Sequence, residues 1–266
     1  MIAVDSEKLK TVINILKLNC VECIVLFEPD GAKINVVDHS NVIMTMIHLK
    51  PEWFIEYAPI CNKIGLYLPN LINATTSVPK NCNIIFSASD EKATSIVATY
   101  TVGNSTYQGK FRTYDPMTIR RPPSNYKELF ERNLKSTYAI TMNNDDYLLA
   151  LQSLGNFYQN GDNIKSKIIM EFEDNNFVIS MLDNDENTMS ATIAAKYVTP
   201  DESKPSGKTG FLITYLQMFK LMANLVPKQN EITIHTGNEK VILYDIDTFD
   251  NTANIKMICA PLVTTE

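Results

Sequence analysis

The chain has 266 residues, of which 45% are hydrophobic and 20% are charged. These values are typical of globular proteins and exclude the disordered and fibrous classes. The formal net charge of −6 excludes a protein that coats nucleic acid with its whole surface, although lysines can still gather on one face.

The sequence shows no sign of export or of a membrane span. No apolar run reaches the roughly 18 residues that a spanning helix needs, and the first ten residues lack the basic and apolar regions of a signal peptide. Five cysteines, an odd number, favour reduced thiols over a disulfide framework. We therefore expect an intracellular protein without membrane partners, nuclear or cytoplasmic according to its host or, for a viral source, in the host replication compartment.

The first periodic segment, from Asp5 to about Leu18, has apolar residues at positions i, i+3, i+4 and i+7 and predicts an amphipathic helix with Asp5 or Ser6 as N-cap. Cys20 and Cys23 follow it as C-x-x-C. Because no second cysteine pair or nearby histidine completes a zinc site, we expect ordinary thiols and neither metal nor cofactor.

Strands are predicted next, and they alternate with turns and one short helix. The expected strands are 22–28, 33–38, 42–49, 64–68, 83–88, 94–102 and 106–112, and the short helix begins at Pro69. The turn Pro29-Asp30-Gly31 separates the first two strands.

The segment from Thr113 to Lys135 breaks this pattern. It carries three prolines and no alternation, so we interpret it as a connector that crosses the surface. The order of elements then repeats, with a helix at about 144–158, strands from Lys167, a second helix at about 214–226, and strands at 231–236, 240–246 and 254–259.

A local repeat supports the duplication. The segment FEPDGAKINVVD, Phe27 to Asp38, returns as FEDNNFVISMLD, Phe172 to Asp183, at an offset of 145 residues (172 − 27 and 183 − 38). A unit of about half the chain is too long for a solenoid repeat and predicts two copies of one domain. Each copy reads as helix, strands, helix, strands, which indicates an α+β fold with antiparallel sheets and the helices on one side.

Several segments resemble one family. TYLQMFKLMANLVP, Thr214 to Pro227, with the strand pair after it and Cys259-Ala260-Pro261, resembles the closing segment of the sliding clamp proliferating cell nuclear antigen (PCNA). LKTVINIL is similar to the first helix of that clamp, and VVDHSNVIMTMIHL, Val36 to Leu49, resembles its D-x-S-x-V strand region. The resemblance spans nearly the whole chain, with clamp domains at 1–112 and 136–266 joined by a connector at 113–135.

This resemblance implies a ring of subunits, each with two topologically similar domains, with sheets outside and helices lining a central hole. Such a ring encircles double-stranded DNA and tethers a DNA polymerase and other replication and repair proteins, and it is not an enzyme. Further expected partners are a clamp loader and proteins with PCNA-interacting peptides. We expect a homotrimer, although a sequence does not count subunits. Enclosure replaces tight binding, so weak phosphate contacts let the ring slide.

The residues expected to face DNA lie opposite the apolar stripes of the helices or next to the helices. They are Lys8, Lys10, Asn14, Lys17, Lys80, Lys220 and Lys228. A lysine stripe is also an ordinary solvated helix face. The third helix departs from the family, because it begins with Asp145 and Asp146, which complement the helix dipole, and no Lys or Arg follows before Lys165.

By the same resemblance, ring closure pairs two exposed strand edges head to tail. The expected edge residues are Thr106, Tyr107, Lys110 and Arg112 in the first half and Ser190, Thr192 and Ala194 in the second.

The resemblance also implies an apolar groove for partner peptides between the connector and the tail. Its expected residues are Val37, Val42, Ile43, Met117, Ile119, Cys259, Ala260 and Pro261. Val37, Val42 and Ile43 also fit plain core positions. The connector departs from the family in carrying the basic run Arg120-Arg121-Pro122-Pro123.

Two alternatives stay open. A PCNA-like viral processivity or transcription factor could bind DNA without closing a ring. A metal-dependent nuclease could use Asp183, Asp185 and Glu186, but these residues suit a turn, and no histidine or lysine accompanies them as a general base. The phosphate-binding patterns G-x-G-x-x-G and G-x-x-x-x-G-K-[ST] do not occur, which leaves no basis for a nucleotide-using enzyme.

Overall fold

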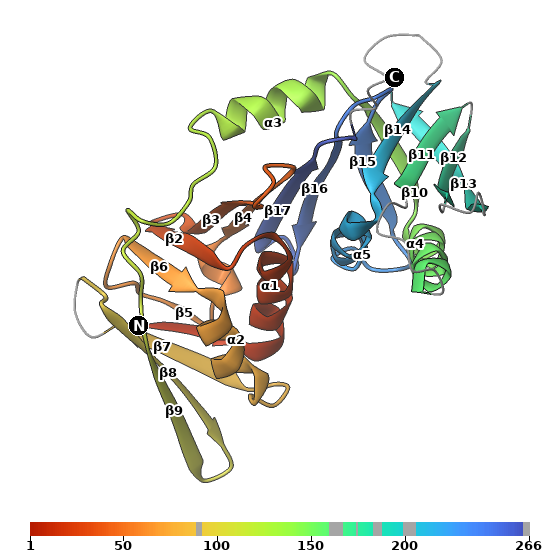
Figure 1. The fold of residues 1–266 in the computed structure, drawn as a ribbon. Coiled ribbons are helices and arrows are strands. Elements are labelled where there is room, and N and C mark those ends of the chain that lie inside the picture. The colour runs from red at the N-terminus through yellow and green to blue at the C-terminus, as the bar shows by residue number, and fades with distance from the viewer. Residues whose placement is uncertain (89–91, 160–166, 174, 183–187, 199–205, 263–266) are drawn as a thin grey trace. The chain divides into compact units, whose positions relative to one another are not determined.

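The computed structural model describes residues 1–88, 92–159, 167–173, 175–182, 188–198 and 206–262 (Figure 1). The chain divides into two compact units. Unit 1 comprises Met1–Pro123 and Asp247–Lys256, and unit 2 comprises Ser124–Ile246 and Met257–Glu266. Among the described residues, no helix combines the length and the apolar character that crossing a bilayer requires.

Unit 1 places two helices against two antiparallel sheets. Its strand orders are β5-β1-β7-β8-β9 and β17-β4-β3-β2-β6, where β17 contributes its residues up to Lys256. Its elements are β1 (Ile2–Asp5), α1 (Ser6–Asn19), β2 (Glu22–Glu28), β3 (Gly31–Val37), β4 (Ile43–Leu49), η1 (Pro51–Trp53), β5 (Glu56–Tyr57), β6 (Lys63–Tyr67), α2 (Leu68–Thr76), β7 (Asn83–Ala88), β8 (Ser95–Val102), β9 (Ser105–Arg112) and the start of β17 (Ala253–Cys259).

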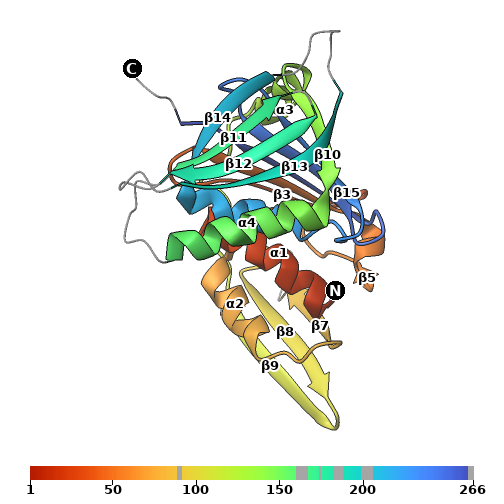
Figure 2. The same ribbon diagram turned by 90° about the vertical axis from the view of Figure 1, so that its right-hand side faces the viewer.

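Unit 2 repeats this order of elements. Its strand order is β14-β11-β12-β13-β10-β15-β16, and α4 crosses the face of the strands β11 to β13 (Figure 2). Its elements are α3 (Tyr126–Lys135), β10 (Tyr138–Asn143), α4 (Asn144–Gln159), β11 (Lys167–Glu173), β12 (Asn176–Leu182), β13 (Thr188–Val198), β14 (Ser206–Leu212), η2 (Ile213–Tyr215), α5 (Leu216–Ala223), β15 (Glu231–Thr236) and most of β16 (Ile242–Thr248).

The predicted α+β class and the duplication are confirmed. The strands β2 and β11, and likewise β3 and β12, have equal lengths and stand 145 residues apart (167 − 22 and 176 − 31). Their pairing repeats too, because Phe27 lies opposite Ala32 in unit 1 and Phe172 lies opposite Phe177 in unit 2. The two units therefore share the strand register as well as the order of elements.

The first helix begins as the sequence predicts. The Asp5 carboxylate accepts hydrogen bonds from the backbone N–H groups of Glu7 (2.9 Å) and Lys8 (3.0 Å), which caps α1. Val12, Ile13 and Leu16 of the predicted apolar stripe are buried. The helix therefore presents one apolar face to the core and leaves the opposite face for polar residues.

The connector differs from the expected irregular segment, because its second half forms α3. This helix buries only Phe130 among the described residues, and the rest of it is exposed or half-buried. A helix of ten residues with a single buried anchor gives little apolar periodicity to detect.

A buried polar residue at the start of the long helix holds the two helices of each unit together. In unit 1, the Ser6 hydroxyl donates to the Pro79 carbonyl at 3.0 Å, just beyond α2. In unit 2, the Asn144 amide donates to the carbonyls of Ala223 (3.0 Å) and Val226 (2.8 Å) at the end of α5. Both side chains are fully buried, so each satisfies carbonyl groups that water cannot reach.

We expect Asn144→Ala to lower the free energy of unfolding of the chain by about 2 kcal/mol, because it leaves buried carbonyl groups without donors. Urea unfolding followed by circular dichroism measures the loss. Asn156→Ala, an exposed position on the same helix, is the matched control and should change stability by less than about 0.5 kcal/mol. Equal losses for the two variants would contradict this role of Asn144.

Candidate nucleic-acid and subunit interfaces

The lysines of α1 differ in the contacts that their ammonium groups make with other residues. Lys17 is exposed, and no ion pair joins it to a described residue. The Lys10 ammonium instead donates to the Val78 carbonyl at 2.7 Å and lies 3.5 Å from a Glu7 carboxylate oxygen. The Lys8 ammonium lies 5.9 Å from the centre of the Phe249 ring, a cation–π contact. Lys17 is therefore the least restrained cation of this helix.

Two more residues of unit 1 are predicted to face DNA. Asn14 is half-buried on α1, and Lys80 is exposed just after α2. The helix α2 itself carries no charged residue, so the cations of this helical face come from α1 and from Lys80.

In unit 2, the two predicted lysines are partly restrained. The Lys220 ammonium packs so closely on α4 that a Cβ atom added to Gly155 would lie 2.5 Å from it. Burial lowers the pKa of Lys220, because a desolvated ammonium is less stable than a hydrated one. Lys228 lies 3.8 Å from the Asp145 carboxylate, and both side chains are largely exposed. Asp145 therefore offsets part of the Lys228 charge.

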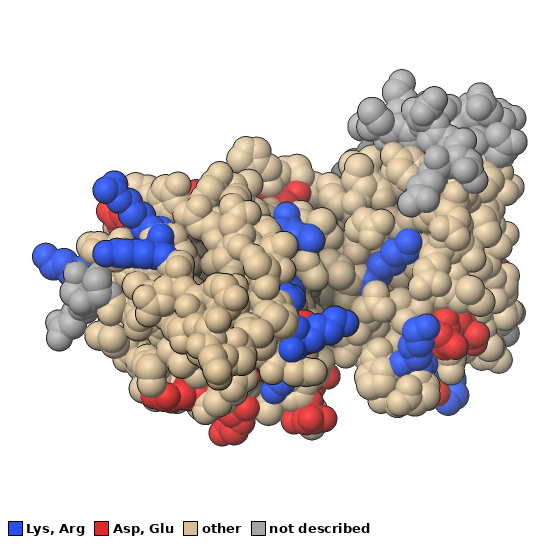
Figure 3. Space-filling model, turned by 90° about the horizontal axis from the view of Figure 1, so that it is seen from below, with Lys and Arg blue, Asp and Glu red and all other residues tan. Residues whose placement is uncertain are grey.

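The exposed side of α4 carries no cation, because α4 contains no Lys or Arg. Asp145, Asp146, Leu149 and Asn156 are exposed there, and the Leu149 side chain is 62% exposed. The acids have the structural role of first-turn residues, with their backbone N–H groups donating to the Asn143 side chain. Figure 3 shows Lys and Arg side chains scattered over this face of the molecule, several of them beside Asp or Glu side chains.

The predicted strand edges are exposed. The strand β9 ends one sheet and pairs only with β8 among the described strands. The Tyr107 ring is 48% exposed and stacks on Tyr100 with the centroids 5.0 Å apart. In β13, residues 188–194 pair with β12, whereas the pairs with β10 begin at Ala195. Ser190, Thr192 and Ala194 are exposed along this segment, and so are Thr106, Lys110 and Arg112 on β9.

The residues predicted for a partner groove fall into two groups. Ile43 and Ile119 are buried, with 3% and 4% of their surfaces exposed, so they belong to the core of unit 1. Met117 is 72% exposed, and Val37 and Val42 are half-buried. In unit 2, Cys259 is buried and the two residues after it, Ala260 and Pro261, are half-buried.

The basic run of the connector has a structural role that local sequence does not reveal. The Arg120 guanidinium donates to the His39 carbonyl at 3.0 Å and to the Asn41 side-chain oxygen at 2.6 Å. Arg121 donates to the Pro116 carbonyl at 3.1 Å. Arg120 therefore fixes the connector to the turn between β3 and β4.

The surroundings of the C-x-x-C pair disfavour the thiolate form of both cysteines. Burial, and after it the charge of Glu22, raises the pKa of the Cys20 thiol to about 12. Burial also raises the pKa of Cys23. Zinc and electrophiles need the thiolate, which these environments disfavour. No cluster of metal-binding side chains occurs in the part of the chain that the structure describes. Asp183, Asp185 and Glu186, the residues of the nuclease alternative, lie outside that part.

We expect iodoacetamide at pH 8 to label Cys20 and Cys23 at least tenfold more slowly in the native chain than in urea, because both thiols stay protonated and Cys23 is also buried. Peptide mass spectrometry measures the two rates. Added Zn²⁺ should leave the unfolding midpoint unchanged. Equal labelling rates in the two states, or stabilisation by zinc, would contradict this interpretation.

Comparison by sequence identifies full-length relatives, although no protein-family model matches the chain. A protein of Methanococcoides burtonii named DNA polymerase sliding clamp is 23% identical over 261 residues, which cover 98% of this chain and 97% of that protein. A protein of Methanosarcina barkeri with the same name is 22% identical over 261 residues, with the same coverage of each.

Comparison by structure gives the same result for the fold. The PCNA of A. fulgidus, solved with the C-terminal region of FEN-1, matches with a TM-score of 0.75 at 19% identity over 100% of both chains. The Proliferating Cellular Nuclear Antigen of Entamoeba histolytica matches with a TM-score of 0.75 at 14% identity over 98% of both chains. The chain therefore has the PCNA fold along its entire length.

Proposed function

We infer that the chain is a sliding clamp of the PCNA family, and we propose that it forms a ring around duplex DNA and tethers a DNA polymerase to it. The observation that carries this proposal is the two-unit fold, which matches PCNA over the full length of both chains. The full-length similarity to archaeal sliding clamps supports it independently. The chain holds its partners on DNA, and any catalysis belongs to those partners.

The ring closes by pairing strand edges. An edge strand presents unpaired N–H and C=O groups, and β9 and residues 188–194 of β13 are two such edges on each subunit. Pairing β9 of one subunit with β13 of the next is a head-to-tail contact, which closes into a ring when the rotation between subunits permits. We propose three identical subunits and therefore six units in the ring.

The enclosed DNA is held loosely. A closed ring cannot leave a DNA circle sideways, so the protein needs only weak contacts with phosphates. The exposed cations that support this role belong mainly to unit 1, with Lys17 and Lys80 the least restrained. Lys228 and Lys220 of unit 2 are weaker candidates for contacts with phosphates. The Asp145 carboxylate offsets part of the Lys228 charge, and the Lys220 ammonium is partly buried.

Partner proteins bind by short peptides. The PCNA of A. fulgidus was solved with the C-terminal region of FEN-1. For this chain we propose that peptides of a polymerase, a clamp loader and repair proteins bind beside the connector. The highly exposed Met117 and the half-buried Val37 and Val42 offer apolar contacts there.

The decisive experiment measures the native mass and the retention on DNA. Analytical ultracentrifugation should give three times the chain mass of 30.0 kDa. After loading, the protein should stay on a closed DNA circle and run off when the circle is linearised. A monomer or dimer that binds circular and linear DNA equally would support a factor without ring closure, and Mg²⁺-dependent cleavage would support a nuclease.

We expect Tyr107→Asp to convert the ring to monomers, because it places a charge on the β9 edge where the neighbouring subunit pairs. Sedimentation measures the mass, and circular dichroism confirms that the fold persists. Tyr114→Asp is the matched control: Tyr114 is 43% exposed and contacts another tyrosine, Tyr67, but lies in the connector. The proposed edge is wrong if Tyr107→Asp keeps the full mass or Tyr114→Asp loses it equally.

We expect Lys17→Gln to weaken DNA binding more than Lys228→Gln, because Asp145 already offsets the Lys228 charge. The slope of log K against log salt should fall by about 0.9 for each Lys17 of the ring that contacts a phosphate. Fluorescence anisotropy with a short duplex at several KCl concentrations measures both slopes. A larger effect of Lys228→Gln would place the main DNA contact in unit 2 instead.

A further inference from the structure

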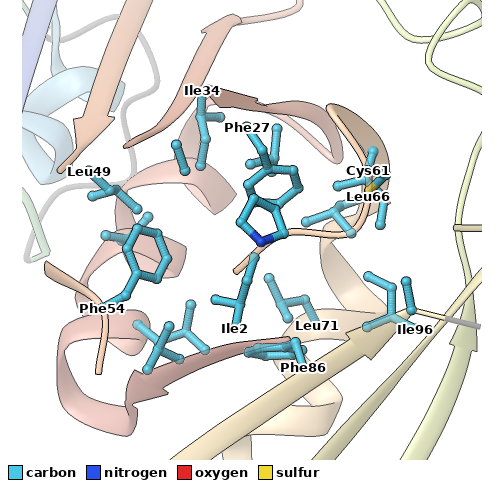
Figure 4. A pocket seen from close by; sticks show the side chains of 18 of the residues that line it. Ile2, Phe27, Ile34, Leu49, Phe54, Cys61, Leu66, Leu71, Phe86 and Ile96 are labelled. Carbon is cyan, nitrogen blue, oxygen red and sulfur yellow. The ribbon is translucent and has the colours of Figure 1, made fainter. Parts of the chain in front are cut away.

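Unit 1 contains an apolar cavity of about 130 Å³ (Figure 4). Its wall combines residues of α1, α2 and both sheets of the unit, and the side chains of Phe27, Phe86 and Leu71 are among those that surround it in Figure 4. An engineered apolar cavity of about 150 Å³ in another protein stays dry and takes up benzene. This cavity is therefore large enough for a molecule built on one six-membered ring.

The wall of the cavity contains one buried side-chain nitrogen without a hydrogen-bond partner among the described residues. Trp53 lines it with only 2% of its surface exposed, and its indole nitrogen has no hydrogen-bond partner among the described residues. No other side-chain nitrogen occurs among the described residues that line the cavity. An unpaired donor in an apolar interior costs free energy, so an acceptor delivered to this N–H would be stabilised.

Two neighbouring aromatic rings hold the Trp53 ring in place. Its centroid lies 4.9 Å from the Phe54 ring and 6.2 Å from the Phe249 ring, both in edge-to-face geometry. Such contacts restrict the reorientation of the indole. The N–H is thus a fixed donor, and an acceptor must come to it.

The cavity reaches the surface of the unit. Met1 and Ile60 both line it, and they are 44% and 49% exposed. A small apolar molecule therefore has an entrance lined by apolar side chains.

We propose that unit 1 binds a small apolar molecule of about one six-membered ring that carries a single hydrogen-bond acceptor, and that this acceptor pairs with the indole N–H of Trp53. This site is independent of ring closure and of DNA. The apolar wall selects the body of the ligand, and the buried indole N–H selects its polar atom.

Two probes of nearly equal shape test the role of the donor. Cyclohexanone carries a carbonyl oxygen where methylenecyclohexane carries a CH₂ group. Trp53 is the one tryptophan of the chain, so its indole N–H gives a single cross-peak in a ¹H–¹⁵N spectrum. We expect cyclohexanone to shift this peak downfield and to raise the melting temperature. Methylenecyclohexane should bind about fivefold more weakly, because it cannot accept the hydrogen bond from Trp53, and one modest hydrogen bond accounts for a factor of about that size.

Two variants separate the donor from the cavity. Trp53→Phe keeps an aromatic ring but removes the N–H. It should reverse the preference for cyclohexanone, because the buried carbonyl then has no donor, and headspace gas chromatography measures both affinities. Leu71→Phe narrows the cavity and should abolish the binding of both. An indole peak and a melting temperature that stay unchanged with millimolar cyclohexanone would overturn the proposal in the unaltered protein. Undiminished binding to Leu71→Phe would overturn the proposed location.

Discussion

The contact on which both units depend is the hydrogen bond from a buried polar side chain at the start of the long helix to the backbone beyond the short helix. Ser6 makes it in unit 1, and Asn144 makes it in unit 2 with a longer side chain and two strong acceptors. Because backbone carbonyls at a helix end must find donors, the position of one helix determines that of the other. This constraint therefore keeps the long and the short helix of each unit next to each other.

On this common scaffold, the two units have diverged in charge. The face of α1 carries exposed or half-buried lysines, whereas α4 carries acids, an exposed leucine and amides. The buried positions keep their apolar character and the strand register persists, since a slip of one residue would turn the core side chains outward. Exposed positions have no such restriction, so a duplicated domain can keep its fold while only one copy retains a basic surface.

Local patterns in the sequence predict most of the fold. The bounds of β2, β7 and β15 agree with the expected 22–28, 83–88 and 231–236, because alternation and turn residues mark both ends of each strand. Patterns fail where long-range contacts decide. The contact of Lys10 with Val78 spans 68 residues and that of Arg120 with His39 spans 81, and no local signal distinguishes these cations from free ones. The cavity at Trp53 likewise arises only when both sheets meet the helices.

The close approach of Lys220 to Gly155 makes the exposure of the Lys220 ammonium to water depend on the residue at position 155. The Lys220 ammonium occupies the space that a side chain at position 155 would need. Even a methyl group there would therefore push the amine outward into water. Rehydration would return its pKa toward the ordinary lysine value and make the cation available to an anionic surface. A substitution on one helix would thus alter the electrostatics of its neighbour without adding or removing a single ionisable residue.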